Sequence, residues 1–452
     1  LLPLYESVYY HNYFAVDFSK IDPEFGTMQD YIDLVKEVHR RGMKIYMDME
    51  MQYVTEDQLW WKDSYGNPNS KYSDYILYND SANTKPESII FGLTELPAYN
   101  GITRKVTTAN LYSKGVQEYT YQIFKYYVDP DSNGKFDDGV DGFRLDHMMD
   151  DLDFKGRLTG LFGKFWSPLF AKLKAINPKL KNVAEQAVWF SYGNEYFNKG
   201  NVDRVFAFQL QAAITSFDKN KIAAIADTTL NMIPPGKQQV VFIENHDMDR
   251  FASKVNGNLD EEKVGAALNL LIGGVPAIYY GQELGMVGKN ANGKYGMTDA
   301  NDIPRREAFE WYKADDGKGM ALWYKNGPWW DNTNLKPNDG ISLEEERSDP
   351  NSLFNFYKKM ISLHQSYSEL INGRYQTLSN NNDKVFSFSR NENTSIVVVI
   401  NLSGQSQQTT VHIQGVKDRK LKQLWGSEKV DISVDQLTVN LPAYGIDVWQ
   451  VQ

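Results

Sequence analysis

The chain has 452 residues, of which 42% are hydrophobic and 23% are charged, a globular composition without the bias of disordered sequences. Its net charge of −10 argues against nucleic acid or an anionic membrane surface as the main partner. The absence of cysteine excludes disulfides, thiolate catalysis and Cys-ligated metals, and it suits either an exported bacterial protein or a cytosolic one. No apolar run approaches the ~18 residues of a membrane span.

The chain starts with Leu1-Leu2-Pro3-Leu4, which lacks the basic start and long apolar stretch of a signal peptide. We expect these residues to be the tail of a buried strand, so that the chain begins inside a domain, which leaves open a targeting segment upstream. Export to the periplasm, the cell surface or the medium is the setting that we expect.

Short apolar runs alternate with longer helical patterns along the chain. The runs are continuous rather than alternating in polarity, as in parallel strands buried on both faces, and they cover residues 43–47, 142–145, 182–184, 205–208, 240–243 and 277–280. The main helical patterns cover residues 28–41, 115–127, 162–176 and 261–272. This α/β alternation predicts a TIM (β/α)8-type barrel.

Two segments differ from the barrel pattern. Residues 52–110 are polar, rich in aromatic residues and too long for a simple loop, which predicts a subdomain inserted after the third strand. A helix is expected to start at Asp349-Pro350 and to run to about His364. Residues 367–452 then show short β-rich runs between Asn, Ser and Gly turns, which predicts an antiparallel β-sandwich. The predicted barrel therefore comprises residues 1–51 and 111–366.

Polar residues directly follow the predicted strands, where a barrel carries its catalytic face: Asp48, Asp146, Glu185, Asn245-His246-Asp247 and Gln282-Glu283. Cleavage of a glycosidic bond needs one ionised and one protonated carboxyl group. Arg144 and Asp146 lie two apart on a strand, so the guanidinium would hold Asp146 ionised as a nucleophile, although a structural salt bridge explains the pair equally well. The apolar run before Glu185 suits a general acid, although a solvated loop residue is the commoner case.

A third carboxylate, Asp247, has His246 beside it in Phe242-Ile-Glu-Asn-His-Asp247. This constellation also fits a metal site or a hydrogen-bond network. Aromatic residues make up 13% of the chain, and their faces stack on sugars as well as in protein cores. Two adjacent pairs, Trp60-Trp61 and Trp329-Trp330, are candidate sugar platforms, with at most one member of each pair facing a ligand.

Together, the order and spacing of these motifs resemble the alpha-amylase family of glycoside hydrolases (family 13) over essentially the whole chain. The resemblance implies that Asp146 is the nucleophile, Glu185 the general acid/base and Asp247 the acid that orients the sugar hydroxyls. Tyr10-His11-Asn12-Tyr13 resembles the family's Tyr-His-Gly-Tyr segment, which implies that Tyr13 stacks on the sugar and His11 bonds its hydroxyls. Arg144, His147 and His246 complete the expected substrate-binding set, together with Tyr53, although a packed position at the strand end explains His147 equally well.

The chain departs from the family pattern in three respects. The third-strand motif reads Asp48-Met-Glu-Met-Gln52-Tyr53, so that Gln52 stands where the family's Asn contributes to a calcium site and Tyr53 where its His contacts the cleaved sugar. Met149-Asp150 replaces the Lys-His that many α-amylases carry after the nucleophile. The family's first barrel strand is expected to be missing from this chain. The cleavage subsites are therefore expected to differ from those of a plain starch hydrolase.

A second calcium candidate is the segment Asp129-Pro-Asp131-Ser-Asn133-Gly-Lys135-Phe-Asp137-Asp138. Oxygen ligands at alternate positions, with Gly sixth, repeat the opening of an EF-hand loop, and the predicted ligands are Asp129, Asp131, Asn133, Lys135 and Asp137. The bidentate Glu at position twelve is replaced by Val140, so Asp137 or Asp138 would have to complete the shell. An Asp/Asn/Gly turn without metal stays an equal alternative.

The sequence therefore predicts a retaining glycosidase with no organic cofactor and with Ca²⁺ as a candidate ion. The expected substrate is an α-1,4-linked glucan from starch, or a maltooligosaccharide. An α-1,6-acting or transglycosylating enzyme of the same family is the alternative, and a sugar-binding protein without turnover is the third reading.

Overall fold

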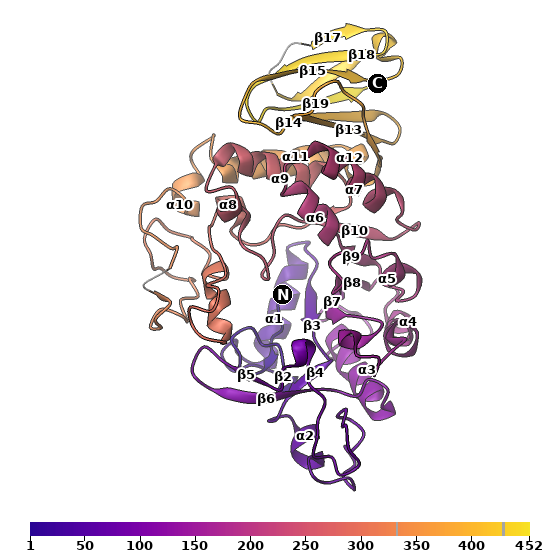
Figure 1. The fold of residues 1–452 in the computed structure, drawn as a ribbon, viewed down its shortest axis with the longest axis vertical. Coiled ribbons are helices and arrows are strands. Elements are labelled where there is room, and N and C mark those ends of the chain that lie inside the picture. The colour runs from indigo at the N-terminus through magenta and orange to yellow at the C-terminus, as the bar shows by residue number, and fades with distance from the viewer. Residues whose placement is uncertain (331–332, 427–429) are drawn as a thin grey trace. The chain divides into compact units, whose positions relative to one another are not determined.

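The computed structural model describes residues 1–330, 333–426 and 430–452, and the chain forms two compact units. The first unit comprises residues 1–189, 193–206 and 296–300, and the second comprises residues 190–192, 207–295 and 301–452. Figure 1 follows the chain from indigo at the N-terminus to yellow at the C-terminus.

A parallel sheet forms the centre of the first unit. Its strands lie in the order β9-β8-β7-β3 and comprise β3 (Tyr46–Met49), β7 (Gly142–Met148), β8 (Lys181–Gln186) and β9 (Arg204–Phe206). The register places Asp48 opposite Arg144. Leu1 exchanges two backbone hydrogen bonds with β3, donating to the Tyr46 carbonyl and accepting from the Asp48 N–H. The carboxyl ends of β3, β7 and β8 thus bring their polar residues to one edge.

Capping side chains mark the start of two long helices of this unit. A reciprocal pair of hydrogen bonds between Thr27 and Asp30 caps α1, and Ser113 caps α3. The predicted helix at 162–176 begins with a π-helical turn over Phe162–Trp166. The helices are α1 (Met28–Arg40), α2 (Leu59–Ser64), α3 (Lys114–Val128), α4 (Ser167–Ile176) and α5 (Asn194–Asn198).

Within residues 52–110 the chain forms a small antiparallel sheet in the order β4-β6-β5, with β4 (Tyr53–Thr55), β5 (Glu95–Pro97) and β6 (Thr103–Thr108). The neighbouring pair β1 (Tyr5–Glu6) and β2 (Asp17–Ile21) is also antiparallel. Trp60 and Trp61 are only 2% and 4% exposed, so their prediction as sugar platforms is wrong. Trp60 instead packs edge-on against Tyr75 and Tyr119 in the core.

The second unit begins with helices and two short parallel strands. The helices are α6 (Phe208–Ile214), α7 (Lys219–Asn231), α8 (Phe251–Lys254), α9 (Leu259–Leu271), α10 (Leu343–Glu346), α11 (Leu353–Ser366) and α12 (Ser368–Asn372). The strands are β10 (Gln238–Val241) and β11 (Val275–Pro276).

Several predicted bounds of strands and helices are wrong. Residues 277–280 do not form a strand. The Asn269 side chain donates a hydrogen bond to the Ala277 carbonyl, and the rings of Tyr279 and Tyr280 pack on the Arg250 guanidinium. The predicted strands at 43–47 and 205–208 are displaced, since β3 begins at Tyr46 and β9 ends at Phe206. The helix predicted from Asp349 starts three residues later, where the Ser352 hydroxyl accepts the N–H of Asn355.

Two antiparallel sheets end the chain. The five-stranded sheet has the order β12-β13-β14-β19-β16 and the three-stranded sheet the order β15-β18-β17. The last strand of the sequence, β19, therefore lies between β14 and β16. The strands are β12 (Arg374–Thr377), β13 (Val385–Asn391), β14 (Ser395–Asn401), β15 (Gln407–His412), β16 (Leu421–Trp425), β17 (Val430–Ser433), β18 (Gln436–Leu441) and β19 (Ile446–Val451).

Strand β14 is buried on both faces. Ile396, Val398 and Ile400 join a core with α7, α9 and α11, whereas Val397 and Val399 join a second core with the three-stranded sheet. Because side chains alternate along a strand, this double burial explains why the sequence of β14 is continuously apolar.

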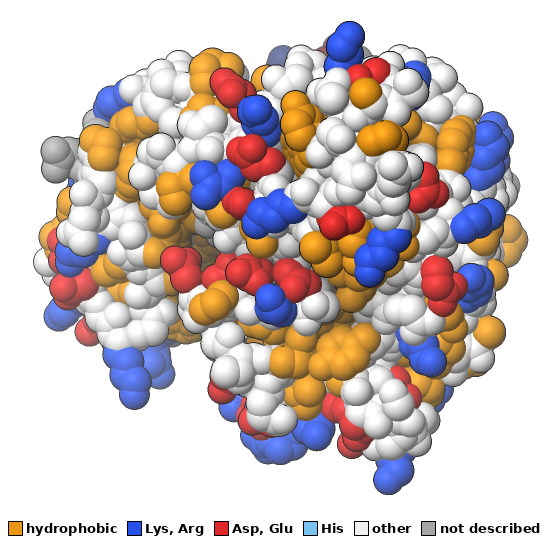
Figure 2. Space-filling view, turned by 90° about the horizontal axis from the view of Figure 1, so that it is seen from below, with side chains coloured by type: hydrophobic (Ala, Val, Ile, Leu, Met, Phe, Trp, Pro, Cys, Tyr) orange, Lys and Arg blue, Asp and Glu red, His pale blue; other side chains and the backbone are white. Residues whose placement is uncertain are grey.

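Figure 2 shows acidic and basic side chains interspersed over one face of the molecule, as the mixed charge along the sequence suggests. None of the helices in the described part of the chain has the length and apolar character needed to cross a bilayer.

A buried acidic side chain on α9 makes the second unit sensitive to pH. Glu262 is 7% exposed, and burial, followed by the charge of Glu244, raises its pKa to about 8. A carboxyl group whose pKa is higher in the folded than in the unfolded state stabilises the fold at low pH. This stabilisation is complete below the unfolded pKa and is lost as the pH rises to about 8.

We expect Glu262→Gln to flatten the dependence of Tm on pH between pH 5 and pH 8. The wild type loses up to ~1.4 kcal/mol per pH unit through this group, whereas the amide cannot ionise. Each kcal/mol corresponds to roughly 2–4 °C in calorimetry. Asp260→Asn, at an exposed position of the same helix, is the control and should follow the wild type. Parallel curves for wild type and Glu262→Gln would contradict the prediction.

Candidate active site

A bulge at the end of β7 directs the predicted catalytic residues. The pairing of β7 with β8 shifts register between Leu145 and Met148. His147 adopts a left-handed backbone conformation with φ 43° in this bulge, which is uncommon for a residue with a side chain. Its N–H donates to Oε2 of Glu185 at 2.9 Å. The bulge thus links the residue after Asp146 directly to Glu185.

The Arg144 guanidinium lies among three carboxylates. Its Nη1 contacts Asp146. The same Nη1 lies 3.0 and 2.9 Å from the two carboxylate oxygens of Asp48, and Nη2 lies 2.9 Å from Oε2 of Glu185. The Arg144 side chain is 12% exposed. The predicted contact between Arg144 and Asp146 is therefore present, and the same cation also holds Glu185.

Negative charge exceeds positive charge in this cluster. Burial raises the pKa of Asp146 well above its usual value, Arg144 opposes this, and the carboxylates of Glu185, Asp48 and Glu50 add to it. The expectation that Arg144 simply keeps Asp146 ionised is therefore too simple, because one cation serves several anions. Asp146 consequently has a raised affinity for a proton.

The predicted sugar-contacting residues His11 and Tyr13 join the same network. The Tyr13 hydroxyl donates to Asp48 at 2.8 Å and accepts from Arg144 at 3.2 Å. His11 accepts the Tyr13 N–H through Nδ1 at 3.1 Å, and its ring stacks on Tyr9 with 5.4 Å between the centroids. The segment 9–13 is thus held against the carboxyl end of β3.

Asp153, which sequence reasoning missed, joins two of the predicted residues. Its Oδ1 accepts the Tyr53 hydroxyl at 2.5 Å and lies 3.0 Å from Nε2 of His147. Burial opposes its ionisation, but the hydrogen bonds from His147 and Tyr53 outweigh burial and lower the pKa of Asp153. Tyr53 is 2% exposed, so its main contacts are within the protein. Asp153 belongs to an Asp-rich stretch in which spacing alone does not single it out.

The Gln52 side chain joins the third strand to the bulge. Its Nε2 donates to the carbonyls of Asp146 and His147 at 2.6 and 3.1 Å, and its Oε1 accepts the Met51 N–H at 2.7 Å. A calcium ligand at this position needs an outward-facing oxygen, whereas here the oxygen is engaged and an N–H faces the carbonyls. The side chains present do not fit the family's common calcium site. Gln52 supplies a direct amide link instead.

Asp247 and His246 lie in the second unit. Arg306 contacts Oδ1 of Asp247 at 3.1 Å and donates to the His246 carbonyl at 2.9 Å. Nε2 of His246 lies 3.2 Å from Oδ2 of Asp247. The Asp247 side chain is 31% exposed and so remains accessible to a ligand. Arg306 lies far along the sequence in an Arg-Arg pair, and no sequence signal linked it to Asp247.

Glu244, three residues before Asp247, contributes to the packing of the protein interior. It forms a buried ion pair with Arg250, in which both side chains are 1% exposed. Trp329 is also buried, and its indole N–H donates to the Tyr324 carbonyl, which removes it as a sugar platform.

The predicted metal loop follows α3. The structure brings Asp129 and Asp131 together with Asp138, whereas the side chain of Asp137 is exposed. The Asn133 side chain donates to Asp131. Burial, followed by the charge of Asp131, raises the pKa of Asp138.

Comparisons with known proteins show the family of the chain. Residues 1–153 and 164–373 match the family described as alpha amylase, catalytic domain, which covers well over half of the chain. The chain belongs to the alpha-amylase family. Residues 375–448 match the family described as maltogenic amylase, C-terminal domain. The predicted fold class, a barrel followed by a C-terminal β domain, is confirmed, and the protein is a glycosidase.

Individual relatives cover most of the chain. Alpha-amylase 3 of Dictyoglomus thermophilum is 28% identical over 89% of this chain and 76% of the relative. Trehalose-6-phosphate hydrolase of Bacillus subtilis is 26% identical over 89% of this chain and 81% of the relative. The crystal structure of the alpha-amylase from H. orenii is similar in fold, with a TM-score of 0.80 and 23% identity over 100% of this chain and 89% of that one.

We expect Asp153→Asn to lower kcat/KM roughly 10- to 100-fold, because a neutral amide holds Tyr53 and His147 less firmly beside Asp146. The matched control is Asp151→Asn, which alters a carboxylate that accepts the Gly156 N–H and should keep most of the activity. Steady-state kinetics and Tm, measured on both variants, separate positioning from folding. Equal losses of activity in the two variants would show that Asp153 has no special role.

Proposed function

We propose that this glycosidase is a retaining hydrolase that cleaves α-1,4-glucosidic bonds in starch-derived glucans or maltooligosaccharides. The observation that carries the proposal is the binding of Asp146 and Glu185 by the two Nη atoms of one Arg144 guanidinium. Carboxyl groups that share one cation lie close together. Retaining enzymes hold the two carboxyl groups about 5–5.5 Å apart, whereas inverting enzymes leave room for a water molecule between them, so a shared cation favours the retaining arrangement.

The proposed reaction has two steps. Asp146 attacks the anomeric carbon while Glu185 gives its proton to the departing glycosidic oxygen, and the bond between the sugar and that oxygen breaks. Glu185 then takes a proton from water, which attacks the anomeric carbon and releases Asp146. Arg144 stabilises the ionised form of the pair, and Asp247 holds the sugar hydroxyls. Relatives named as an alpha-amylase and a cyclomaltodextrinase support an α-glucan substrate.

A second candidate activity is the cleavage or transfer of α-1,6-linked glucose. Two observations favour keeping it: Tyr53 is tied to Asp153 where the family has a sugar-contacting His, and a relative of Bacillus subtilis named as a probable oligo-1,6-glucosidase is 24% identical over 89% of this chain.

Substitution of the two acids should have different consequences. We expect Asp146→Asn to lower turnover of both maltotriose and an aryl glucoside with an activated leaving group, on the order of 10³-fold or more, because no nucleophile remains. We expect Glu185→Gln to affect maltotriose far more than the activated glucoside, since a good leaving group needs no proton. Circular dichroism and Tm check the fold of both. Near-wild-type activity in Asp146→Asn would refute its assignment as nucleophile.

The products of digestion show which glycosidic linkage the enzyme cleaves. With starch, maltotriose, pullulan and isomaltose as substrates, thin-layer chromatography should show glucose and maltooligosaccharides from starch and maltotriose, and no cleavage of isomaltose. Release of glucose from isomaltose, or the appearance of products longer than the substrate, would favour the α-1,6-acting or transglycosylating alternative. Asp146→Asn serves as the blank, so that contaminating glycosidases are detected.

A further inference from the structure

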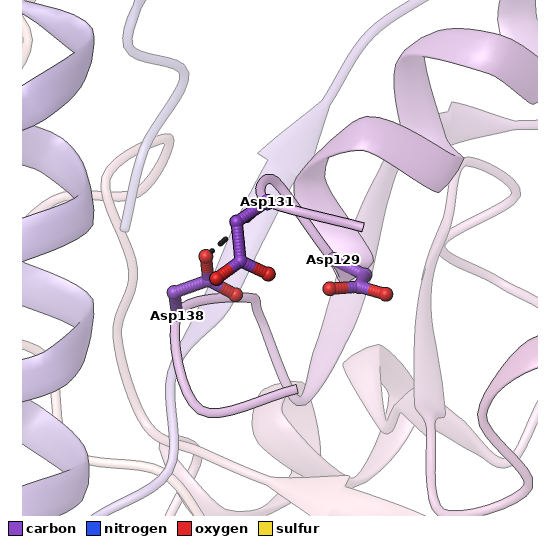
Figure 3. Close-up of side chains that lie close together, drawn as sticks. All are labelled: Asp129, Asp131 and Asp138. Atoms are coloured by element: carbon purple, nitrogen blue, oxygen red, sulfur yellow. Dashed lines mark hydrogen bonds between the residues drawn. The ribbon is translucent and has the colours of Figure 1, made fainter. Parts of the chain in front are cut away.

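The loop between α3 and β7 places three carboxylates around one point. Oxygen atoms of Asp129, Asp131 and Asp138 all lie within 4.8 Å of one another. Figure 3 shows the side chains of Asp131 and Asp138 next to each other and that of Asp129 across the opening of the loop. Acidic groups of this kind are common on surfaces, so the state of each oxygen decides whether the cluster is a binding site.

Two of these carboxylates have a buried oxygen with no hydrogen-bond donor. Asp138 is 1% exposed, and its Oδ2 accepts the Asp131 N–H at 3.3 Å, but its Oδ1 has no partner among the described residues. Asp129 is similar, because its Oδ2 accepts the Gly134 N–H at 2.9 Å whereas its Oδ1 is buried without a partner in the described part of the chain. A buried carboxylate without a donor or cation is costly. A cation between these oxygens removes that cost.

The backbone of the loop is built to hold this arrangement. Gly134 has φ +76°, a left-handed conformation that a side chain disfavours, and its N–H faces Asp129. At Gly139 a Cβ atom would lie 1.9 Å from the Val128 carbonyl oxygen. The glycine therefore allows Asp138 to approach the end of α3 closely. These constraints fix Asp129 and Asp138 on opposite branches of the loop.

We propose that Asp129, Asp131 and Asp138 bind one Ca²⁺ ion. All the donors are oxygens, which excludes the soft nitrogen and sulfur sites of zinc or copper. Ca²⁺ binds oxygen at about 2.3–2.6 Å, so its ligand oxygens can lie up to ~5.2 Å apart, and the three oxygens here all lie within 4.8 Å of one another. Mg²⁺ requires a tighter octahedron, with opposite oxygens only ~4.0–4.2 Å apart.

The site differs from the one that the sequence pattern predicts. The side chain of Asp137 is exposed, and its backbone carbonyl lies 2.9 Å from Nδ1 of His39. Asn133 Oδ1 accepts the Lys135 N–H at 2.8 Å, so this oxygen is already engaged in the turn. Of the two candidates, the buried Asp138 rather than Asp137 is thus the closing ligand, and water can complete the shell from the solvent side.

Bound Ca²⁺ would stabilise the fold and would not take part in the reaction. The ion would connect the end of α3 to the segment that leads into β7, which carries Asp146. We therefore expect Ca²⁺ to raise Tm and to leave the catalytic groups themselves unchanged.

The test uses the whole protein after treatment with EDTA and desalting. Calorimetric titration with CaCl₂ should show one site that Asp138→Asn and Asp131→Asn weaken at least about 10-fold. CaCl₂ should raise the Tm of the wild type by several degrees, and should raise that of the two variants much less. Asp137→Asn is the matched control, one residue from Asp138, and should respond like the wild type. MgCl₂ at the same concentration should give a smaller increase in Tm.

Three results would overturn the proposal. One is an unchanged Tm and no binding heat when CaCl₂ is added to the chelated wild type. Another is an equal loss of the calcium effect in Asp137→Asn and Asp138→Asn, which would reflect surface charge alone. The third is a full calcium effect in both Asp131→Asn and Asp138→Asn, which would place the ion elsewhere. If Asp138→Asn fails to fold, the exposed Asp131 gives the same comparison against Asp137→Asn.

Discussion

The active-site arrangement of the first unit depends on the guanidinium of Arg144. A single cation contacts Asp48, Asp146 and Glu185 and receives a further polar partner in the Tyr13 hydroxyl. Removing the cation would leave buried carboxylates facing one another, which is far costlier than the loss of an exposed ion pair. Arg144 therefore holds the strand ends together and opposes the protonation of Asp146.

The contacts around this centre come mostly from the backbone and from neutral side chains. The bulge directs the His147 N–H to Glu185, and the Gln52 amide bonds the carbonyls on either side of the bulge. Glu50 accepts the N–H groups of Phe14 and Tyr53, which connects the segment after Tyr13 to the third strand. The contacts of the His147 N–H and the Gln52 amide fix geometry without adding net charge to a site that already has an excess of carboxylates.

Structural features that depend on a local sequence pattern could be predicted. Continuous apolar runs located most of the parallel strands, and the spacing of Arg144 and Asp146 predicted their contact. Features that depend on tertiary packing could not be predicted. Asp138 is buried whereas Asp137 is exposed, and Trp60 and Trp61 lie in the core. The sequence around these residues does not indicate which of them are buried. The roles of Asp153 and Arg306 also escaped prediction, because each contacts residues that other segments bring near.

The position of β19 has a consequence for biosynthesis. This strand is the last in the sequence, yet it lies inside the five-stranded sheet and pairs with both β14 and β16. While the chain emerges from the ribosome, β14 therefore lacks a neighbour along one edge and presents unpaired backbone groups on a strongly apolar strand. Until β19 has been synthesised, that edge stays open and the nascent chain tends to aggregate. The five-stranded sheet can therefore form in full only after residues 446–451 have emerged.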